Sequence, residues 1–349
     1  MTPPPPRSPT APPAPAPPPD VLVIGAGIAG LTAARALSRA GLAALVLEKS
    51  RGLGGRAATR TVHGARVDHG AQFFTARDPR FRAEVDGWLR DGVARVWADG
   101  FPSWSAAGGW HDAEPGANPR YACPDGMNAL GKRLAEGLAV MRGARAVAVR
   151  PADGGWEVEL EDGTRRRAPR VVVTAPVPQA LELVRGVEWP AGMRDGLEAV
   201  TYAPCFAVMA GYPDAPAPAW PGVRLPDHPG LAWIASDGDK RDAGGAGTVL
   251  VLHATPTFTR RRFDDPPAAN VADLLRAASA VVPWAERPAW TDHQRWRYAL
   301  AEAPHPERAL QPAPGLVLAG DGFAGGVGGR TEGAYLSGLA AASPLTHSD

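Results

Sequence analysis

The chain has 349 residues, with 37 Lys plus Arg against 36 Asp plus Glu and a formal net charge of +1. This length is enough for two closely joined domains or for one large α/β unit. The near-neutral charge gives no indication of a nucleic-acid partner. No apolar run approaches the length of a membrane span, so no membrane partner is expected either.

The numbers and positions of cysteine and histidine bear on the cellular location and on metal binding. The two cysteines, Cys123 and Cys205, lie far apart and outside any C-x-x-C motif. This favours a reducing, cytoplasmic location, although it leaves a disulfide between them open. The eight histidines are scattered without the spacing of metal ligands, so no metal site is predicted. Nothing in the sequence predicts the oligomeric state.

Residues 1–19 form the first segment, and Thr2 to Pro19 is mostly proline and alanine. The segment has neither the apolar core of a signal peptide nor twin arginines. Its composition predicts a disordered tail with extended polyproline conformers. A proline-motif ligand for another protein is the alternative.

Residues 21–48 predict a βαβ unit that binds a dinucleotide. An apolar run from Val21 to Ile24 ends in a G-x-G-x-x-G turn, a helical pattern follows from Leu31 to Ala40, and a second apolar run from Leu42 to Leu47 ends in Glu48. The helix N-terminus offers N–H groups to phosphates, and a carboxylate at Glu48 can accept hydrogen bonds from ribose hydroxyls. The alternative is a glycine-rich turn of another α/β protein. The predicted contacts in the turn are Gly25, Gly27, Ile28, Ala29 and Gly30.

A loop from Lys49 to Thr59 follows, and it contains Gly54-Gly55-Arg56. Glycine brings backbone close to a ligand, and an arginine side chain can bind a pyrophosphate oxygen through two donors. The loop resembles that of the flavoprotein family of amine oxidases, phytoene desaturases, protoporphyrinogen oxidases and renalases. The resemblance implies FAD contacts from Lys49, Gly55 and Arg56. A surface ion pair is the alternative for Arg56.

The C-terminal segment completes this resemblance. Residues 315–321 read as a last buried strand ending in Gly320-Asp321, a glycine-rich turn spans 322–329, and a helix follows from Arg330 to Ala340. In this flavoprotein class the aspartate binds the ribityl or phosphate region of FAD, and the helix N-terminus points at the pyrimidine end of the flavin. No cysteine lies near residues 322–330, so FAD is expected to be non-covalent. A merely flexible loop is the alternative for 322–329. The implied contacts are Gly320, Asp321, Arg330, Thr331 and Glu332.

Because the two cofactor segments lie at opposite ends of the chain, a discontinuous domain is predicted. The expected fold class is α/β: a Rossmann-type FAD-binding domain with a second, largely antiparallel β substrate domain, as in p-hydroxybenzoate hydroxylase and amine oxidases. A strand at 170–176, an antiparallel meander at 144–149 and 156–160, and helices at 127–138 and 270–282 are expected. The predicted FAD-binding domain comprises 20–74, 122–178 and 310–349, and the substrate domain comprises 75–121 and 179–309.

A more specific resemblance, to the renalase family and closest to its bacterial branch, covers residues 20–342. The motifs that resemble it are 67–78, 231–235, 251–255, 294–299 and 320–323. The resemblance implies oxidation of dihydronicotinamide dinucleotides in isomeric forms. Hydride leaves the 2- or 6-position for flavin N5, NAD(P)⁺ is released, and dioxygen reoxidises the flavin to give hydrogen peroxide. No second G-x-G-x-x-G stands in a βαβ context, and no nucleophile triad is evident.

Several residues are candidates for the site beside the flavin ring. Gly70, Ala71 and Gln72 are expected to run past the ring, with Gln72 bonding the flavin or the ligand or else bracing a turn. His69 could face the site, but the favoured role is a buried histidine whose hydrogen bonds are made within the core. If residues 296–298 form a strand, only Trp296 and Tyr298 share a face. Arg297 is a candidate for the ligand's pyrophosphate or carboxamide, with an internal ion pair as the alternative.

Two other functions stay open at this stage. A conventional amine oxidase would want an aromatic cage and a lysine hydrogen-bonded towards flavin N5, but none of the chain's lysines, Lys49, Lys132 and Lys240, stands in a suitable motif. A flavin-binding protein without turnover, acting through a partner, is the third reading. The run Arg260-Arg261-Arg262 reads as a solvated face, with a role at ligand phosphates as its alternative.

Overall fold

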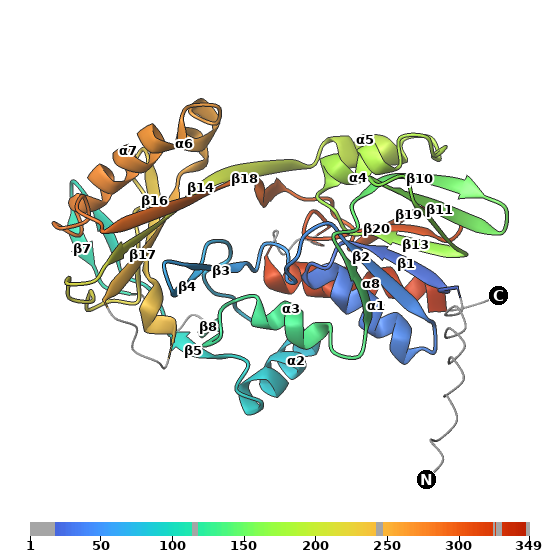
Figure 1. The fold of residues 1–349 in the computed structure, drawn as a ribbon, viewed down its shortest axis with the longest axis horizontal. Helices are drawn as coiled ribbons and strands as arrows, with labels where there is room; N and C mark the ends of the chain where they lie inside the picture. Colours follow the sequence, from blue (N-terminus) through green and yellow to red (C-terminus); the bar gives the residue numbers. More distant parts are fainter. Residues whose placement is uncertain (1–17, 114–117, 242–246, 324, 326–329, 347–349) are drawn as a thin grey trace, which may run out of the picture.

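The computed structural model describes residues 18–113, 118–241, 247–323, 325 and 330–346. The expected tail at 1–17 and most of the glycine-rich turn at 322–329 therefore lie outside the described residues. Two large sheets dominate the molecule and stand side by side in Figure 1. The long strands β14 and β18 belong to the second sheet and extend towards the first.

The first sheet has six strands in the order β19-β20-β13-β1-β2-β9. Five strands run parallel, and only β19 is antiparallel to its neighbour. The central strand β1 is fully apolar and buried, as expected for a parallel strand covered on both faces. The strands are β1 (Val21–Ile24), β2 (Ala44–Glu48), β9 (Ala139–Arg142), β13 (Arg170–Val173), β19 (Ala309–Ala313) and β20 (Leu316–Ala319).

Helices cover one face of this sheet, and a smaller sheet covers the other (Figure 1). On the first face the apolar side chains of Leu31 and Leu37 pack in one core with Tyr335 and Leu336. That core contains α1 (Ile28–Arg39), α8 (Thr331–Thr346), α2 (Pro79–Arg90) and α3 (Ala129–Leu134). The opposite face packs against β10 (Ala146–Ala152), β11 (Gly155–Leu160), β12 (Arg165–Ala168), α4 (Val177–Leu183) and α5 (Met193–Glu198).

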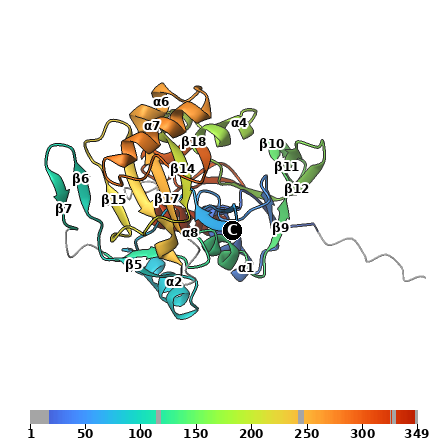
Figure 2. The ribbon, with the colours of Figure 1, turned by 60° about the vertical axis from the view of Figure 1, so that its left-hand side comes forward.

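The second sheet has seven strands in the order β18-β14-β17-β16-β15-β6-β7. Its neighbours pair antiparallel except β15 with β6. Figure 2 shows α6 (Pro256–Arg261) and α7 (Pro267–Ser279) lying together over this sheet. Its strands are β6 (Ser103–Ser105), β7 (Gly109–His111), β14 (Thr201–Tyr212), β15 (Gly222–Arg224), β16 (Leu231–Ser236), β17 (Thr248–Ala254) and β18 (Trp290–Ala303).

The other face of the second sheet, called the inner face below, meets a hairpin that follows the first sheet's β2. Met209, Trp233 and Val251 from the sheet pack with Val67 of the hairpin. Residues directly opposite on antiparallel strands share a face, so His253 and Trp296 also belong to the inner face. The remaining elements are β3 (Thr59–Val62) and β4 (Ala65–Asp68) of this hairpin, the pair β5 (Arg95–Ala98) and β8 (Arg120–Ala122), and the short 3₁₀ helix η1 (Asp237–Lys240).

The architecture confirms the predicted α/β fold with a second, largely antiparallel sheet. The meander expected from 144–160 is present, with a third strand added at β12. The helix expected over 127–138 is only α3, because Gly137 adopts a left-handed φ of 77° that ends helical geometry. Helix α7 begins three residues before the expected 270, where Pro267 suits the first helical turn.

The domain boundaries remain a proposal, and one segment packs differently from the division drawn from sequence. Phe81, Val85 and Trp88 of α2 lie in the core that α1 and α8 share. The sequence assigns this helix to the substrate domain, because residues 75–121 lie outside the predicted cofactor-binding segments. Its apolar side chains instead contact the dinucleotide-binding sheet's helices.

Candidate active site

Neighbouring parallel strands of the six-stranded sheet end at one edge, and the candidate site is built on the ends of three of them. The chain leaves β1 at Gly25, β13 at Thr174 and β20 at Gly320. The hydroxyl of Thr174 donates to the carbonyl of Ile24 at 2.8 Å, and Gly320 lies directly beside Thr174. Ligands bind outside the carboxyl ends of such strands. The first and last strands of the chain therefore meet where a dinucleotide is expected.

The N-terminus of α1 faces this edge. Gly27 is its N-cap residue, and no side chain caps the helix there. A Cβ built on Gly27 would have no described atom within 4 Å, whereas one on Gly30 would lie 2.0 Å from the carbonyl oxygen of Gly25. Gly27 thus borders open space, and Gly30 packs helix against strand. A phosphate can approach the uncapped helix end, so the turn fits the predicted cofactor.

Glu48 is buried at the end of β2 and serves the glycine turn directly. One carboxylate oxygen accepts from the backbone N–H of Ala26 at 2.7 Å, and the other accepts from the N–H and hydroxyl of Ser50, each at 2.7 Å. Its four acceptor positions leave room for a further donor. A hydrogen bond from a ribose hydroxyl to Glu48 remains a prediction.

Arg56 joins the two ends of the chain. Its guanidinium donates to both carboxylate oxygens of Asp321, at 2.6 and 2.5 Å, and to the carbonyl of Tyr298 at 2.9 Å. Burial alone would lower the pKa of Arg56, but the adjacent Asp321 raises it above its ordinary value. The pair is a two-donor, two-acceptor contact, the strongest geometry available to these side chains. It places a permanent cation and an anion at the site's centre.

The backbone around Gly55 and around Gly70–Ala71 packs close to Arg56. The N–H of Ala71 donates to the carbonyl of Arg56 at 2.9 Å, and a Cβ on Gly70 would lie 2.0 Å from that carbonyl oxygen. Gly55 contacts Gly27, since a Cβ on Gly55 would meet Gly27's Cα at 3.1 Å. The structure therefore brings the three glycine-containing loops predicted from sequence into one place.

Gln72 is 5% exposed, and both ends of its amide are bonded within the protein. The NH₂ group donates to the carbonyls of Asp68 and Gly70, at 2.5 and 3.1 Å, and the oxygen accepts from the ammonium of Lys240 at 2.8 Å. Both donors are thus used in bracing the 68–72 turn. Of the two readings of Gln72, these contacts favour the brace, and a direct bond to flavin or ligand remains untested.

The three β18 candidates divide between the two faces of the sheet. The indole N–H of Trp296 donates to the carbonyl of His69 at 2.8 Å, and the two rings stack 5.5 Å apart. The ring of Tyr298 meets that of Tyr202 edge-on. Arg297 instead lies over the ring of Phe263 at 4.3 Å. Strand alternation turns Arg297 away from Trp296, and it makes no ion pair among the described residues. Its contact with the ligand remains a prediction.

The remaining predicted contacts are spread around the start of α8. Glu332 is buried and accepts the backbone N–H groups of Arg77 and Asp78, at 2.7 and 2.6 Å, so it ties α8 to the start of α2. Thr331 begins α8. Arg330 and Lys49 are exposed. Sequence reasoning did not foresee the bond between Glu332 and residues 77–78, because no local pattern joins them.

His253 is a further candidate, which enters the sequence analysis only as part of the motif at 251–255. Its Nε2 atom is buried and has no hydrogen-bond partner among the described residues. Burial, with further effects of Lys240 and His69, lowers its pKa to about 3. Its imidazole is therefore neutral near pH 7 and lies on the inner face of the second sheet. The pairing of β17 between β14 and β16, which places it there, was the missing signal.

His69 provides a prediction about pH. Burial, and then the neighbouring Arg60, lower the pKa of His69 to about 4, so the folded protein keeps it neutral where an unfolded chain would protonate it. Stability should therefore fall as the pH drops from about 6.5 to about 4, by up to about 1.4 kcal/mol per pH unit for this histidine.

A His69→Phe variant tests that slope, because it keeps a ring against Trp296 and removes the titrating group. Urea unfolding of both proteins at about pH 7 and about pH 5 measures the difference. The variant should lose less stability between the two conditions than the wild type. Equal losses would show that His69 is protonated in the folded protein.

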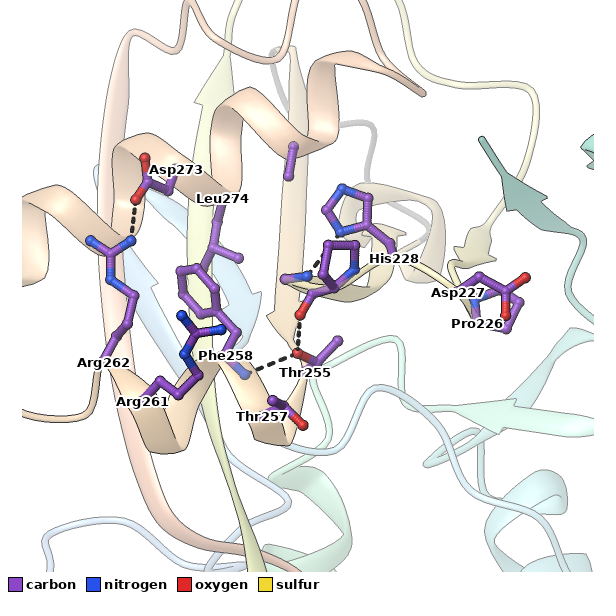
Figure 3. A pocket seen from close by; sticks show the side chains of 13 residues that line it. Pro226, Asp227, His228, Thr255, Thr257, Phe258, Arg261, Arg262, Asp273 and Leu274 are labelled. Carbon is purple, nitrogen blue, oxygen red and sulfur yellow. Dashed lines mark hydrogen bonds and ion pairs between the residues drawn. The ribbon is translucent and has the colours of Figure 1, made fainter. Parts of the chain in front are cut away.

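A separate pocket of about 580 Å³ lies away from this site (Figure 3). It is bounded by the loop 226–230 and by α6 and α7, which pack on the outer face of the second sheet. Arg261 and Arg262 both line it, and Arg262 also pairs with Asp265 and Asp273. Arg260 pairs with Glu302. The arginine run therefore lies outside the inner face and does not reach the predicted flavin contacts.

The parallel sheet, the uncapped glycine turn and the Arg56–Asp321 pair define a Rossmann-type dinucleotide-binding fold. Comparison with known proteins agrees. The family model described as flavin containing amine oxidoreductase matches residues 91–345, and the NAD(P)-binding Rossmann-like domain matches 23–87. The chain belongs to the flavin-containing amine oxidoreductase family, and its cofactor is FAD.

Individual relatives agree with this family assignment. The chain is 26% identical to renalase of Mus musculus over 321 residues, covering 87% of this chain and 92% of the mouse protein. It is 41% identical over 88 residues to (S)-6-hydroxynicotine oxidase of Paenarthrobacter nicotinovorans, covering 24% and 20% of the two chains. The predicted membership of the amine-oxidase-like flavoproteins is confirmed, and the chain is similar to renalase along most of its length.

Solved structures share the fold. A putrescine oxidase with bound putrescine matches with a TM-score of 0.74 at 16% identity, covering 94% of this chain and 98% of that one. A putative protoporphyrinogen oxidase from an Exiguobacterium species matches with a TM-score of 0.72 at 14% identity, covering 93% and 97%. At this identity the likeness shows the architecture alone.

Three further observations concern the described residues only. No helix there has the length and apolarity needed to cross a membrane. No group of three or more histidine, cysteine or carboxylate side chains is arranged to hold a metal ion within those same residues. Cys123 and Cys205 are both free thiols, so the disulfide left open by the sequence is not formed.

Proposed function

We propose that this chain oxidises isomeric dihydronicotinamide dinucleotides, the 2- and 6-dihydro forms of NAD(P)H. Its support is the match to renalase along 87% of the chain, together with the renalase-family motifs at 67–78 and 294–299. The products would be NAD(P)⁺ and, with dioxygen as acceptor, hydrogen peroxide. The free thiols are consistent with the reducing cytoplasm as its location.

The state of the lysines is the observation that favours this function over amine oxidation. An amine oxidase of this fold is expected to have a lysine that hydrogen-bonds towards flavin N5. Lys49 and Lys132 are exposed. The ammonium of Lys240 is fully buried and has three acceptors for its three N–H donors: Gln72, Asp237 and Asp68. Among the described residues, Lys240 therefore has no donor left to hold a water at the ring.

The two buried histidines also favour hydride transfer from a dihydropyridine. His69 and His253 both have pKa values lowered mainly by burial, to about 4 and about 3, so they are weak bases near neutral pH. A dihydropyridine gives up hydride without losing a proton first, so it needs no strong base. Two imidazoles that stay neutral near pH 7 suit such a substrate.

Bound FAD would supply the hydride acceptor at N5 and the electron transfer to dioxygen. The protein's own groups then have binding and orienting roles. The uncapped N-terminus of α1 and the guanidinium of Arg56 would hold the phosphates. Trp296, stacked on His69, offers an aromatic wall beside the ligand. The packed aromatic residues of the inner face would exclude water.

Anaerobic mixing of the FAD-loaded protein with candidate reductants tests the proposal. The 2- or 6-dihydro isomers of NAD(P)H should bleach the flavin rapidly, whereas ordinary β-NADH and benzylamine-type amines should do so much more slowly. Absorbance at the visible flavin band in a stopped-flow instrument measures each rate. β-NADH as the best reductant would overturn the proposal, amines as the best would indicate an amine oxidase, and bleaching by none would indicate a protein without turnover.

A further inference from the structure

The strongest unassigned feature of the structure is a buried cluster of four charges between the two sheets. Asp68 ends β4 of the hairpin, whereas Asp237, Lys240 and Arg241 lie in or beside η1 of the second sheet. Lys240 contacts Asp237 at 2.9 Å and Asp68 at 3.4 Å, and Arg241 contacts the same carboxylates at 2.7 and 3.4 Å. Asp68, Asp237 and Lys240 are 0% exposed.

Such a cluster is a weak source of stability. Removing two carboxylates and two cations from water is unfavourable, and their mutual attraction does little more than offset it. The cluster is electrically balanced, and its Asp68 carboxylate also accepts from the N–H of Met127 at 2.9 Å and the hydroxyl of Thr59 at 2.6 Å. Three separate segments are therefore held in one register, so the cluster specifies geometry more than it adds free energy.

Gln72 connects the cluster to the cofactor segment. A lysine ammonium can only donate, so its contact with Gln72 fixes the amide oxygen towards Lys240. The NH₂ end must then face the carbonyls of Asp68 and Gly70. This arrangement sets the path of the backbone from Gly70 to Gln72, which also packs on the carbonyl of Arg56.

We infer that Lys240 is a positioning residue that acts through the Gln72 amide to hold the Gly70–Gln72 backbone against the flavin ring. The inference rests on the proposed placement of the ring beside this segment, and it goes beyond the proposed substrate. Lys240 itself does not contact the reacting atoms in this account. Its influence on the ring is carried by the Gln72 amide, which orients the peptide groups facing the cofactor.

Two variants separate positioning from stability. Gln72→Leu removes the amide and leaves all four charges paired, so it should fold and bind FAD. Lys240→Met combined with Asp237→Asn removes one charge of each sign and leaves Asp68 opposite Arg241. A matched control, Arg35→Met with Glu84→Gln, removes a half-buried 2.7 Å ion pair between α1 and α2 that does not contact the 68–72 segment.

Each variant is compared with the wild type by visible circular dichroism of bound FAD and by the midpoint potential of the flavin. The rate constant of flavin reduction at saturating dihydronicotinamide isomer is the third readout. Gln72→Leu and the Lys240/Asp237 variant should each change the dichroism and potential in the same direction and slow reduction about tenfold. The Arg35/Glu84 control should match the wild type in all three.

The combined triple variant decides whether Lys240 acts through Gln72. If it does, the triple variant reduces no more slowly than Gln72→Leu alone, because the path is already broken. A multiplied loss, about a hundredfold, would show independent action and overturn the inference. A changed melting temperature with unchanged dichroism and potential would also overturn it.

The experiment separates failure of this inference from failure of the proposed function. If no dihydronicotinamide isomer reduces the wild type, the proposed function fails, but dichroism and midpoint potential still report on ring position. If the Lys240/Asp237 variant does not bind FAD, Gln72→Leu alone decides: unchanged dichroism and potential would overturn the inference, and a shift in both would support it.

Discussion

A Gly30→Ala variant is expected to lose its folded dinucleotide-binding sheet or to retain it only weakly. The added Cβ would lie 2.0 Å from the carbonyl oxygen of Gly25 and 2.8 Å from the hydroxyl of Thr174. The first of these is backbone held between two strands, so α1 must move away from β1. Overpacking of this kind costs about 3 kcal/mol or more. Thermal unfolding of the FAD-free protein measures the loss.

Gly27→Ala is the matched control, because the same methyl group enters open space. Gly27 has a φ of −77°, which any L-residue adopts, and no described atom lies within 4 Å of its Cβ position. Stability without FAD should stay within about 0.5 kcal/mol of the wild type. FAD affinity should fall at least about tenfold, since the methyl would occupy the predicted path of the pyrophosphate.

The two glycines therefore have opposite expected profiles, one in stability and one in affinity. Fluorescence titration of FAD into the unliganded proteins, beside their melting curves, distinguishes them. An FAD affinity unchanged in Gly27→Ala would place the pyrophosphate elsewhere and remove the basis of the proposed cofactor contacts at this turn.

Arg56→Lys is expected to weaken FAD binding by about one to two orders of magnitude. Arg56 bonds both oxygens of Asp321 and the carbonyl of Tyr298. A lysine ammonium keeps the charge but cannot reproduce the planar two-donor geometry, so Asp321 loses part of its partner and the loop 49–59 loses its link to β20. Equilibrium dialysis of FAD gives the dissociation constant.

Arg35→Lys is the control for this substitution. Arg35 also pairs with a carboxylate at 2.7 Å, that of Glu84, but the pair lies between α1 and α2 away from the strand ends. Its FAD affinity should match the wild type. Equal affinities for Arg56→Lys and the wild type would show that the guanidinium geometry is irrelevant to the cofactor.

Much of the fold follows from patterns contained in short stretches of sequence. The buried apolar run at 21–24, the turn at 25–30 and the helix after it appear as β1 and α1. The run before Gly320 and the helix after Arg330 appear as β20 and α8. These signals are local, because strand and helix periodicity and glycine spacing are set within about 30 residues.

The partners of individual polar residues were harder to predict from the sequence than the helices and strands. The FAD contacts of Gln72 and Glu332 stay predictions, but their bonds to Lys240 and to the backbone of 77–78 were not predicted. Arg297 was expected near the ligand and lies on Phe263. A polar residue's partner depends on which segment packs against it, and a single sequence contains no record of that packing.

By itself the sequence determined the βαβ unit and the motifs that carry the family resemblance, since each of these lies in a short stretch of contiguous residues. Only the tertiary structure decided that Arg56 pairs with Asp321, 265 positions away, and that Lys240 holds Gln72 across 168 positions. These contacts arise where the two sheets face each other, and that approach depends on the combined burial of apolar side chains from the whole chain. Local periodicity does not encode it, so the chemistry of the site became visible only in the folded protein.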